Sequence, residues 1–250
     1  MQAEAAIQSD PGAIDLGGVE AVLDCSGALW LPASRTLVVS DLHFEKGSHY
    51  AARGQFLPPF DTRATLDGLE RLMRLCQPRT MVSLGDAFHD VDAEQRMDEA
   101  DAARLERLSR SADWIWVLGN HDPLPPKRFA GASHQMVDVG GLRFSHEPGD
   151  HAEWQVAGHF HPCAVARKEG RGIRRPAFIT DGKRMVMPAF GAFTGGLNVL
   201  DDAFAPHFSK DHQVHLCGEH RVYRVPLKSL RPDGGTGQRL RTLKQPIQQR

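Results

Sequence analysis

The residues best suited to chemistry stand in short polar stretches that directly follow apolar segments. One such stretch, Gly119-Asn120-His121-Asp122, follows residues 113–118, whose apolar and aromatic side chains predict a buried strand. Asn offers a carbonyl oxygen to a metal, His offers a titratable nitrogen, and Asp can hold that His in one tautomer. Because ligands bind at the carboxyl ends of strands in α/β proteins, the stretch indicates a site, although alone it also fits an ordinary polar turn.

The same arrangement recurs after four other predicted strands. Seven of the polar side chains at strand ends are oxygen or nitrogen donors suited to Mn²⁺, Fe²⁺ or Zn²⁺: Asp41, His43, Asp86, Asn120, His146, His159 and His161. One ion cannot use seven ligands, but two ions can if a carboxylate bridges them. Paired ions about 3.5–4 Å apart clamp the attacking and leaving oxygens of an in-line displacement at phosphorus. The pattern therefore favours phosphoester hydrolysis.

The order of the predicted elements explains how these side chains meet. Strand 36–40, helix 63–76, strand 80–84, helix 93–112 and strand 113–118 predict a parallel sheet with right-handed crossovers. After residue 123, short strands with tight turns predict a second, mainly antiparallel sheet. These strands are a hairpin of 137–139 and 142–145, then 154–157, 164–167, 176–180, 184–187 and 222–225. Residues 191–198 form a Gly-rich, aromatic loop expected near the site, and His212, His215 and His220 are expected at the surface.

Composition sets the class of protein. With 250 residues, 41% hydrophobic and 24% charged, the chain is typical of a globular protein that fills one large or two small domains. We expect residues 1–16 to be a loose lead-in, 17–227 the domain, and 228–250 a basic, disordered tail. Strand-sized apolar runs, an acidic N-terminus and four scattered cysteines predict a cytoplasmic protein with reduced thiols and no membrane contact. A net charge of -1 requires any nucleic-acid surface to be local.

Taken in order, the blocks resemble the calcineurin-like metallophosphoesterase superfamily over about residues 36–165. They read Asp-x-His at 41–43, Gly-Asp at 85–86, Gly-Asn-His-Asp at 119–122, a single His at 146 and Gly-His-x-His at 158–161. Closer features, at 41–47, 85–90, 146–148 and 189–198, resemble the bacterial ligase-associated DNA-damage-response endonucleases. The resemblance implies an α/β fold, a four-layer metallophosphoesterase sandwich of two mixed β-sheets flanked by helices.

The resemblance also implies two ligand sets that share Asp86. One ion would take Asp41, His43, Asp86 and His161, and the other Asp86, Asn120, His146 and His159. His134 and His151 are alternatives to His146, which we prefer because it ends a predicted strand. The cofactor expected is a pair of divalent ions, Mn²⁺ first, with Fe²⁺ or Zn²⁺ as alternatives.

The expected mechanism is in-line attack by a metal-bridging hydroxide. His121 would protonate the leaving group, Asp122 would orient His121, and His89 would give a second contact to the phosphate. A non-catalytic protein that keeps the fold for binding predicts lost ligands, and none is lost.

Substrate choice depends on less specific signals. A basic cluster follows the last motif and would hold a DNA backbone, unless it is only a solvated hairpin: Arg167, Lys168, Arg171, Arg174 and Arg175. Five phenylalanines next to motif residues are candidates to stack bases, with core packing as the alternative: Phe44, Phe88, Phe160, Phe190 and Phe193. We expect a DNA endonuclease acting on single-stranded or structured DNA in repair, and family context implies association with a DNA ligase and helicase. The alternative is a phosphatase or a phosphodiesterase of small molecules or cyclic nucleotides.

Overall fold

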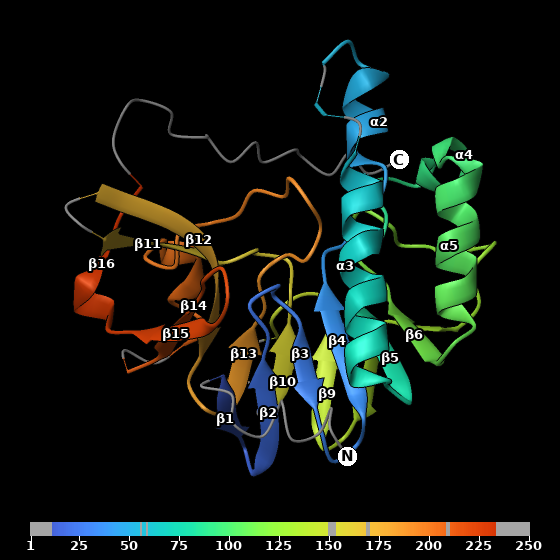
Figure 1. Ribbon diagram of the computed structural model, residues 1–250. Coiled ribbons are helices and arrows are strands. Elements are labelled where there is room, and N and C mark those ends of the chain that lie inside the picture. Colours follow the sequence, from blue (N-terminus) through green and yellow to red (C-terminus); the bar gives the residue numbers. More distant parts are fainter. Residues whose placement is uncertain are drawn as a thin grey trace, which may run out of the picture.

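Two β-sheets packed face to face form the centre of the molecule (Figure 1). The computed structural model describes residues 12–55, 57–58, 60–149, 154–168, 171–208 and 211–233. Within these ranges the chain has the mixed α/β architecture that the sequence predicted, with two large mixed sheets and few helices.

The first sheet has seven strands in the order β1-β2-β3-β4-β5-β6-β7. Their bounds are β1 Ala13–Leu16, β2 Val19–Leu23, β3 Leu29–Leu31, β4 Thr36–Ser40, β5 Thr80–Leu84, β6 Asp113–Val117 and β7 Ala132–His134. Strands β1 to β4 pair antiparallel, whereas β4 to β7 pair parallel. The register sets Ser40 beside Leu84 and Leu84 beside Val117, so the residues that follow β4, β5 and β6 emerge at one edge.

The second sheet has nine strands, with the path β15-β14-β12-β13-β10-β9-β8; off this path, β11 pairs with β12, and β16 pairs with β11. Their bounds are β8 Met136–Val139, β9 Leu142–Ser145, β10 Gln155–Ala157, β11 Cys163–Lys168, β12 Arg171–Thr180, β13 Arg184–Val186, β14 Gln213–Cys217, β15 Val222–Val225 and β16 Leu230–Arg231. Strands β9, β10 and β13 pair in parallel, and the other pairs are antiparallel. The sheet is therefore mainly antiparallel, as the sequence predicted.

Alternation along the central strands explains why they are apolar throughout. In β4, Leu37 and Val39 pack on one side of the sheet, while Val38 packs on the other. The side of Val38 faces the second sheet, where it joins a core that includes Phe144 and Phe178. A strand covered on both faces needs apolar side chains at successive positions, which is the pattern that predicted these strands.

Helices cover the outer face of the first sheet (Figure 1). The main ones are α3 (Asp61–Cys76) and α5 (Glu99–Ser109), with α2 (Lys46–Ala51) and α4 (Ala93–Arg96) beside them. On the outer face of the second sheet, the short 3₁₀ helix η1 (Asp202–Phe204) packs Phe204 against Ile179 and Val186. A second 3₁₀ turn, η2 (Leu227–Ser229), precedes β16. The four layers are therefore present, with little helix in the last one.

Several local predictions need correction. The single helix expected over 93–112 is two, because the Asp98 side chain caps the amide of Ala100 and starts a new helix there. Strand β1 lies within the segment expected as a lead-in, and η2 and β16 lie within the segment expected as a tail. The rest of that tail, from residue 234, lies outside the described residues. None of the described helices combines the length and the apolar character that crossing a bilayer requires.

His215 was expected at the surface, but it lies in β14 and is buried. The sequence did not reveal this strand because Gln213 and His215 break its apolar pattern. Burial, together with the charge of Arg224, lowers the pKa of His215 to about 4. In the unfolded chain the pKa of His is about 6.5, so the unfolded state takes up the proton first as the pH falls. Stability that is present above pH 6.5 is therefore lost between about pH 6.5 and 4, by up to about 3 kcal/mol.

Replacing His215 with Leu removes this titration. We expect His215→Leu to lose less unfolding free energy than the wild type between pH 7 and pH 4, measured by urea denaturation at both pH values. His220→Leu, the same change at an exposed histidine, serves as the control and should keep the wild-type pH dependence. If His215→Leu lost as much unfolding free energy as the wild type between pH 7 and pH 4, titration of the buried His215 would not be the cause of the loss.

Candidate metal centre

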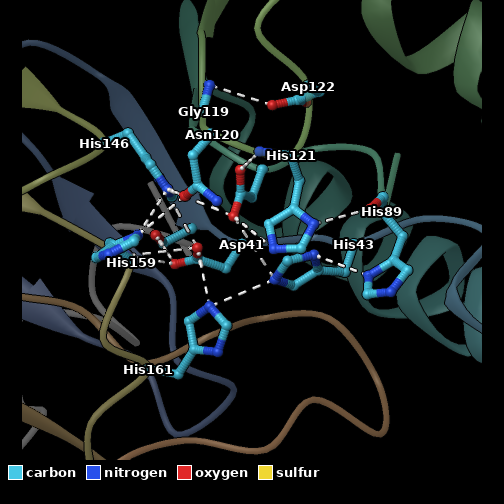
Figure 2. A network of polar contacts seen from close by, with 12 residues as sticks. Asp41, His43, His89, Gly119, Asn120, His121, Asp122, His146, His159 and His161 are labelled. Carbon is cyan, nitrogen blue, oxygen red and sulfur yellow. Dashed lines mark hydrogen bonds and ion pairs between the residues drawn. The ribbon is translucent and has the colours of Figure 1, made fainter. Parts of the chain in front are cut away.

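All seven predicted metal ligands lie together near the ends of five strands from the two sheets. Figure 2 labels six of them, all but Asp86. Asp41 follows β4, Asp86 follows β5 and Asn120 follows β6 in the first sheet. His146 follows β9 and His159 follows β10 in the second sheet. The face-to-face packing of the sheets therefore brings both groups of strand ends to one place.

One group of donors surrounds Asp41, whose side chain is fully buried. The Nε2 atom of His161 lies 3.0 Å from Asp41 Oδ1 and 3.3 Å from His43 Nε2. Ser40 Oγ and the backbone amide of His159 donate to the Asp41 carboxylate. These contacts fix the carboxylate while leaving it beside two imidazoles.

A second group surrounds Asp86. His146 Nε2 lies 3.4 Å from Asp86 Oδ2 and 2.9 Å from Asn120 Oδ1. His159 Nδ1 lies 3.0 Å from the same amide oxygen and 3.2 Å from His146 Nε2. Asp86 Oδ2 is also 4.0 Å from His43 Nε2, so this carboxylate lies between the two groups.

The chain turns sharply at most of these residues. Five of the seven have a backbone φ between 44° and 67°, which is uncommon for residues other than Gly. They are Asp41, His43, Asp86, His159 and His161. Each such residue costs about 1–3 kcal/mol and persists only where its surroundings impose it. Five strained residues in one cluster indicate a functional site, because such conformations are commonest at active and binding sites.

Gly119 shows why a glycine precedes the ligand Asn120. A Cβ atom at this position would lie 2.1 Å from Asp86 Oδ1 and 2.3 Å from the Asp86 amide nitrogen. Any side chain here would displace the Asp86 carboxylate, so the glycine before Asn120 is required by packing.

Buried carboxylates need compensating charge. Desolvation opposes the ionised form of Asp86, but the hydrogen bond and charge of His146, with the amide of His121, lower its pKa to about 2. Asp41 is likewise desolvated, and His161, His146 and His43 outweigh this and lower its pKa. Both side chains are therefore carboxylates at neutral pH, as metal ligands must be.

The imidazoles divide into two kinds. Burial lowers the pKa of His43 to about 3, so this ring is neutral and able to donate a lone pair. For His146, burial is outweighed by Asp86 and Asp41, which raise its pKa to about 8. The carboxylates thus favour a positive charge at this position, which a proton or a metal ion can supply.

These donors fit divalent ions. His161 Nδ1 lies 3.0 Å from the Gly195 carbonyl and donates to it, so Nε2 faces Asp41 and His43. Burial opposes a charge on His161, but Asp41 and the Gly195 carbonyl outweigh it and raise its pKa, so a positive charge is favoured here, which a proton or a metal ion can supply. Among the described residues, three groups of side chains have donor atoms that all lie within 4.8 Å of one another: Asp41 with His43 and His161, Asp41 with Asp86 and His146, and His43 with His89 and His121. Nitrogen and oxygen donors without a thiolate suit Mn²⁺, Fe²⁺ or Zn²⁺. Of the alternatives to His146, His134 is exposed at the end of β7, and His151 lies outside the described residues.

His121 lies beside the centre, where it forms a third group of donors with His43 and His89. Its Nδ1 is 2.9 Å from the carbonyl oxygen of His89, and its Nε2 is 4.0 Å from Asp86 Oδ2. The side chain is 42% exposed, against 3% for Asp86, so an incoming substrate can reach it. This placement allows His121 to exchange a proton with a substrate.

Two roles expected from the sequence need correction. The Asp122 carboxylate accepts from the amides of Phe88 and Gly119, so it holds the loop, while the His89 carbonyl orients the ring of His121. Burial raises the pKa of Asp122 to about 7. The ring of His89 is itself buried, with Nδ1 3.4 Å from His43 Nδ1, so it supports His43 where a phosphate contact was expected.

The basic cluster on β11 and β12 is only partly available. Arg174 pairs with Asp233 and donates to the Gly196 carbonyl, and Arg175 pairs with Glu219. Arg167 is exposed, whereas the side chains of Lys168 and Arg171 lie outside the described set. Pairing with acids reduces what Arg174 and Arg175 offer a DNA backbone, and binding of DNA by the cluster stays a prediction.

Supporting contacts around the ligands were not found by sequence reasoning. The Gly195 carbonyl on His161 belongs to a loop 34 residues away, and the hydroxyl of Ser40 acts on the adjacent Asp41. Backbone carbonyls leave no signal in a sequence. The Gly-rich composition of residues 191–198 was the one indication that this loop lies near the site.

Comparison with known proteins agrees with this geometry. Residues 34–159 match the model of the calcineurin-like phosphoesterase family, which is half of the chain, and the chain therefore belongs to that family. It is a hydrolase that acts on phosphoester bonds, and the sequence-based assignment to this superfamily is confirmed.

Among solved structures, the chain is similar to the Pseudomonas putida nuclease MPE, with 27% identity and a TM-score of 0.64. The match covers 85% of this chain and 98% of that one. A protein of unknown function from Aquifex aeolicus has 18% identity and a TM-score of 0.36, covering 54% of this chain and 81% of that one. The E. coli phosphoesterase Yfce has 13% identity and a TM-score of 0.38, covering 76% and 97%. No curated protein sequence matches the chain.

Proposed function

We propose that the protein is a binuclear metal-dependent phosphodiesterase that cuts DNA internally, on single-stranded or structured substrates, in DNA repair. The observation that carries the proposal is the pair of donor groups on either side of Asp86, with His121 next to them. Asp41, His43, Asp86 and His161 would hold one ion, and Asp86, Asn120, His146 and His159 the other. When bound, a pair of divalent ions activates water as a nucleophile and offsets the charge that develops at phosphorus.

The protein's own residues supply position and protons. The hydrogen bond from His121 Nδ1 to the His89 carbonyl fixes the orientation of the ring, so its Nε2 lies 4.0 Å from Asp86 Oδ2 at the edge of the centre. The role proposed for Nε2 is to give a proton to the departing oxygen. A general acid of this kind contributes about 10²–10⁴-fold in rate.

Nucleic acid is the favoured substrate because the similar Pseudomonas putida protein is a nuclease and is matched over nearly its whole length. One observation favours the alternative of a small diester. Arg174 and Arg175 are already paired with acids, so the surface next to the centre offers fewer cations to a polyanion. Manganese as the native ion, a cytoplasmic location and association with a DNA ligase and helicase stay predictions.

The test is a paired assay with Mn²⁺ on circular single-stranded DNA and on bis-p-nitrophenyl phosphate. We expect both to be hydrolysed, because a closed circle has no ends and reports internal cleavage. Asp86→Ala should be inactive on both, since each donor group loses the carboxylate between them. Asp113→Ala, at the opposite end of β6 and exposed, is the matched control and should be fully active.

Hydrolysis of the small diester with intact DNA would move the function to a small-molecule phosphodiesterase. Near-normal turnover by Asp86→Ala would contradict the proposal that two ions share the Asp86 carboxylate.

Changing His121 separates proton transfer from metal binding. His121→Ala should keep the wild-type metal content, measured by plasma mass spectrometry after desalting. Its activity on DNA should fall about 10²–10⁴-fold, whereas bis-p-nitrophenyl phosphate, whose leaving group needs no proton, should lose much less. If metal content falls with activity, His121 is a ligand and the role assigned to it is wrong.

A further inference from the structure

The loop from Phe190 to Asn198 joins the site at two points, both on donors of the group around Asp41. The Gly191 amide donates to the Asp41 carbonyl at 3.2 Å, and the Gly195 carbonyl accepts from His161 Nδ1 at 3.0 Å. Between these points, Thr194 N donates to the Gly191 carbonyl and closes a turn whose third residue is Phe193. Phe193 is therefore held within two residues of each anchor.

Two side chains outside the loop also hold its backbone. The Ala192 amide donates to Thr65 Oγ1 on α3 at 3.0 Å, and Arg174 Nη2 donates to the Gly196 carbonyl at 2.6 Å. A Cβ on Gly196 would lie 1.7 Å from the His161 carbonyl oxygen, so the loop backbone lies directly on the ligand segment. The platform that carries Phe193 is rigid before any substrate arrives.

Phe193 differs from the other aromatic side chains near the motifs. Phe44 and Phe88 are buried in the core, and Phe160 and Phe190 are partly buried against it. Phe193 is 55% exposed, so of the five candidates it alone offers most of its surface to a ligand. Its φ of 58° lies in the region that this turn position normally reserves for Gly or Asn. A bulky apolar side chain that is both exposed and strained has no stabilising role in this position, which points to a ligand.

We propose that Phe193 stacks on a nucleobase of the DNA strand next to the scissile phosphate. The inference rests on the proposed function and adds a preference for unpaired bases, because a base must leave its partner to present a face to the ring. Alanine substitution at such stacking contacts costs about 1–3 kcal/mol per base, so a loss of about tenfold in kcat/KM is expected.

The test compares two single-stranded 12-mers with the same backbone charge, oligothymidylate and an oligomer of tetrahydrofuran abasic residues. Phe193→Ala should lower kcat/KM about tenfold on oligothymidylate and leave the abasic oligomer within about twofold. Phe193→Trp should restore cleavage of oligothymidylate. Leu200→Ala, a change of an exposed apolar side chain two residues beyond the loop, is the control and should alter cleavage of neither substrate. Mn²⁺ affinity by calorimetry and the melting temperature should be unchanged in Phe193→Ala.

An equal loss on both oligomers, or weaker Mn²⁺ binding, would show that Phe193 acts through the loop and would overturn the inference. No loss on either oligomer would overturn it as well. A wild-type protein that cleaves neither oligomer but hydrolyses bis-p-nitrophenyl phosphate would overturn the proposed function, and the inference with it.

Discussion

Two carboxylates buried side by side are the constraint on which the rest of the structure depends. Asp41 and Asp86 are almost wholly removed from solvent, and each remains ionised because imidazoles and amides surround it. Leaving such charges without partners would cost several kcal/mol per ion. The strand ends, the positive backbone φ at five of the predicted ligands and the glycine at position 119 bring compensating groups to these two side chains.

The sequence could predict what depends on local pattern. Strand β4 is apolar at successive positions because both its faces are covered, and the donors after it follow at once. The sequence does not predict strand β14 because Gln213 and His215 interrupt its apolar pattern, and the predicted helix 93–112 is too long because the cap at Asp98 starts a new helix. The donors themselves were found because their residue types and spacing are chemical signals.

Contacts across the fold set the roles that the sequence could not give. Asp122 follows His121 in the chain, yet its carboxylate accepts from the amide of Phe88, 34 residues away. Arg174 has the residue type of a phosphate contact, yet it braces the loop that carries the Gly195 carbonyl. Such assignments depend on which backbone atom lies within reach, and that becomes known only when the chain is folded. The residues that position the predicted ligands are therefore fixed by particular contacts, as the predicted ligands themselves are.

The most direct test of the account is electron paramagnetic resonance of the protein titrated with Mn²⁺. Two ions that share the Asp86 carboxylate, about 3.5–4 Å apart, would be exchange-coupled. We therefore expect a coupled multiline spectrum at two equivalents per chain, and only isolated Mn²⁺ signals in Asp86→Ala. Saturation at one ion per chain with full activity, or two ions that remain magnetically isolated, would contradict the binuclear centre.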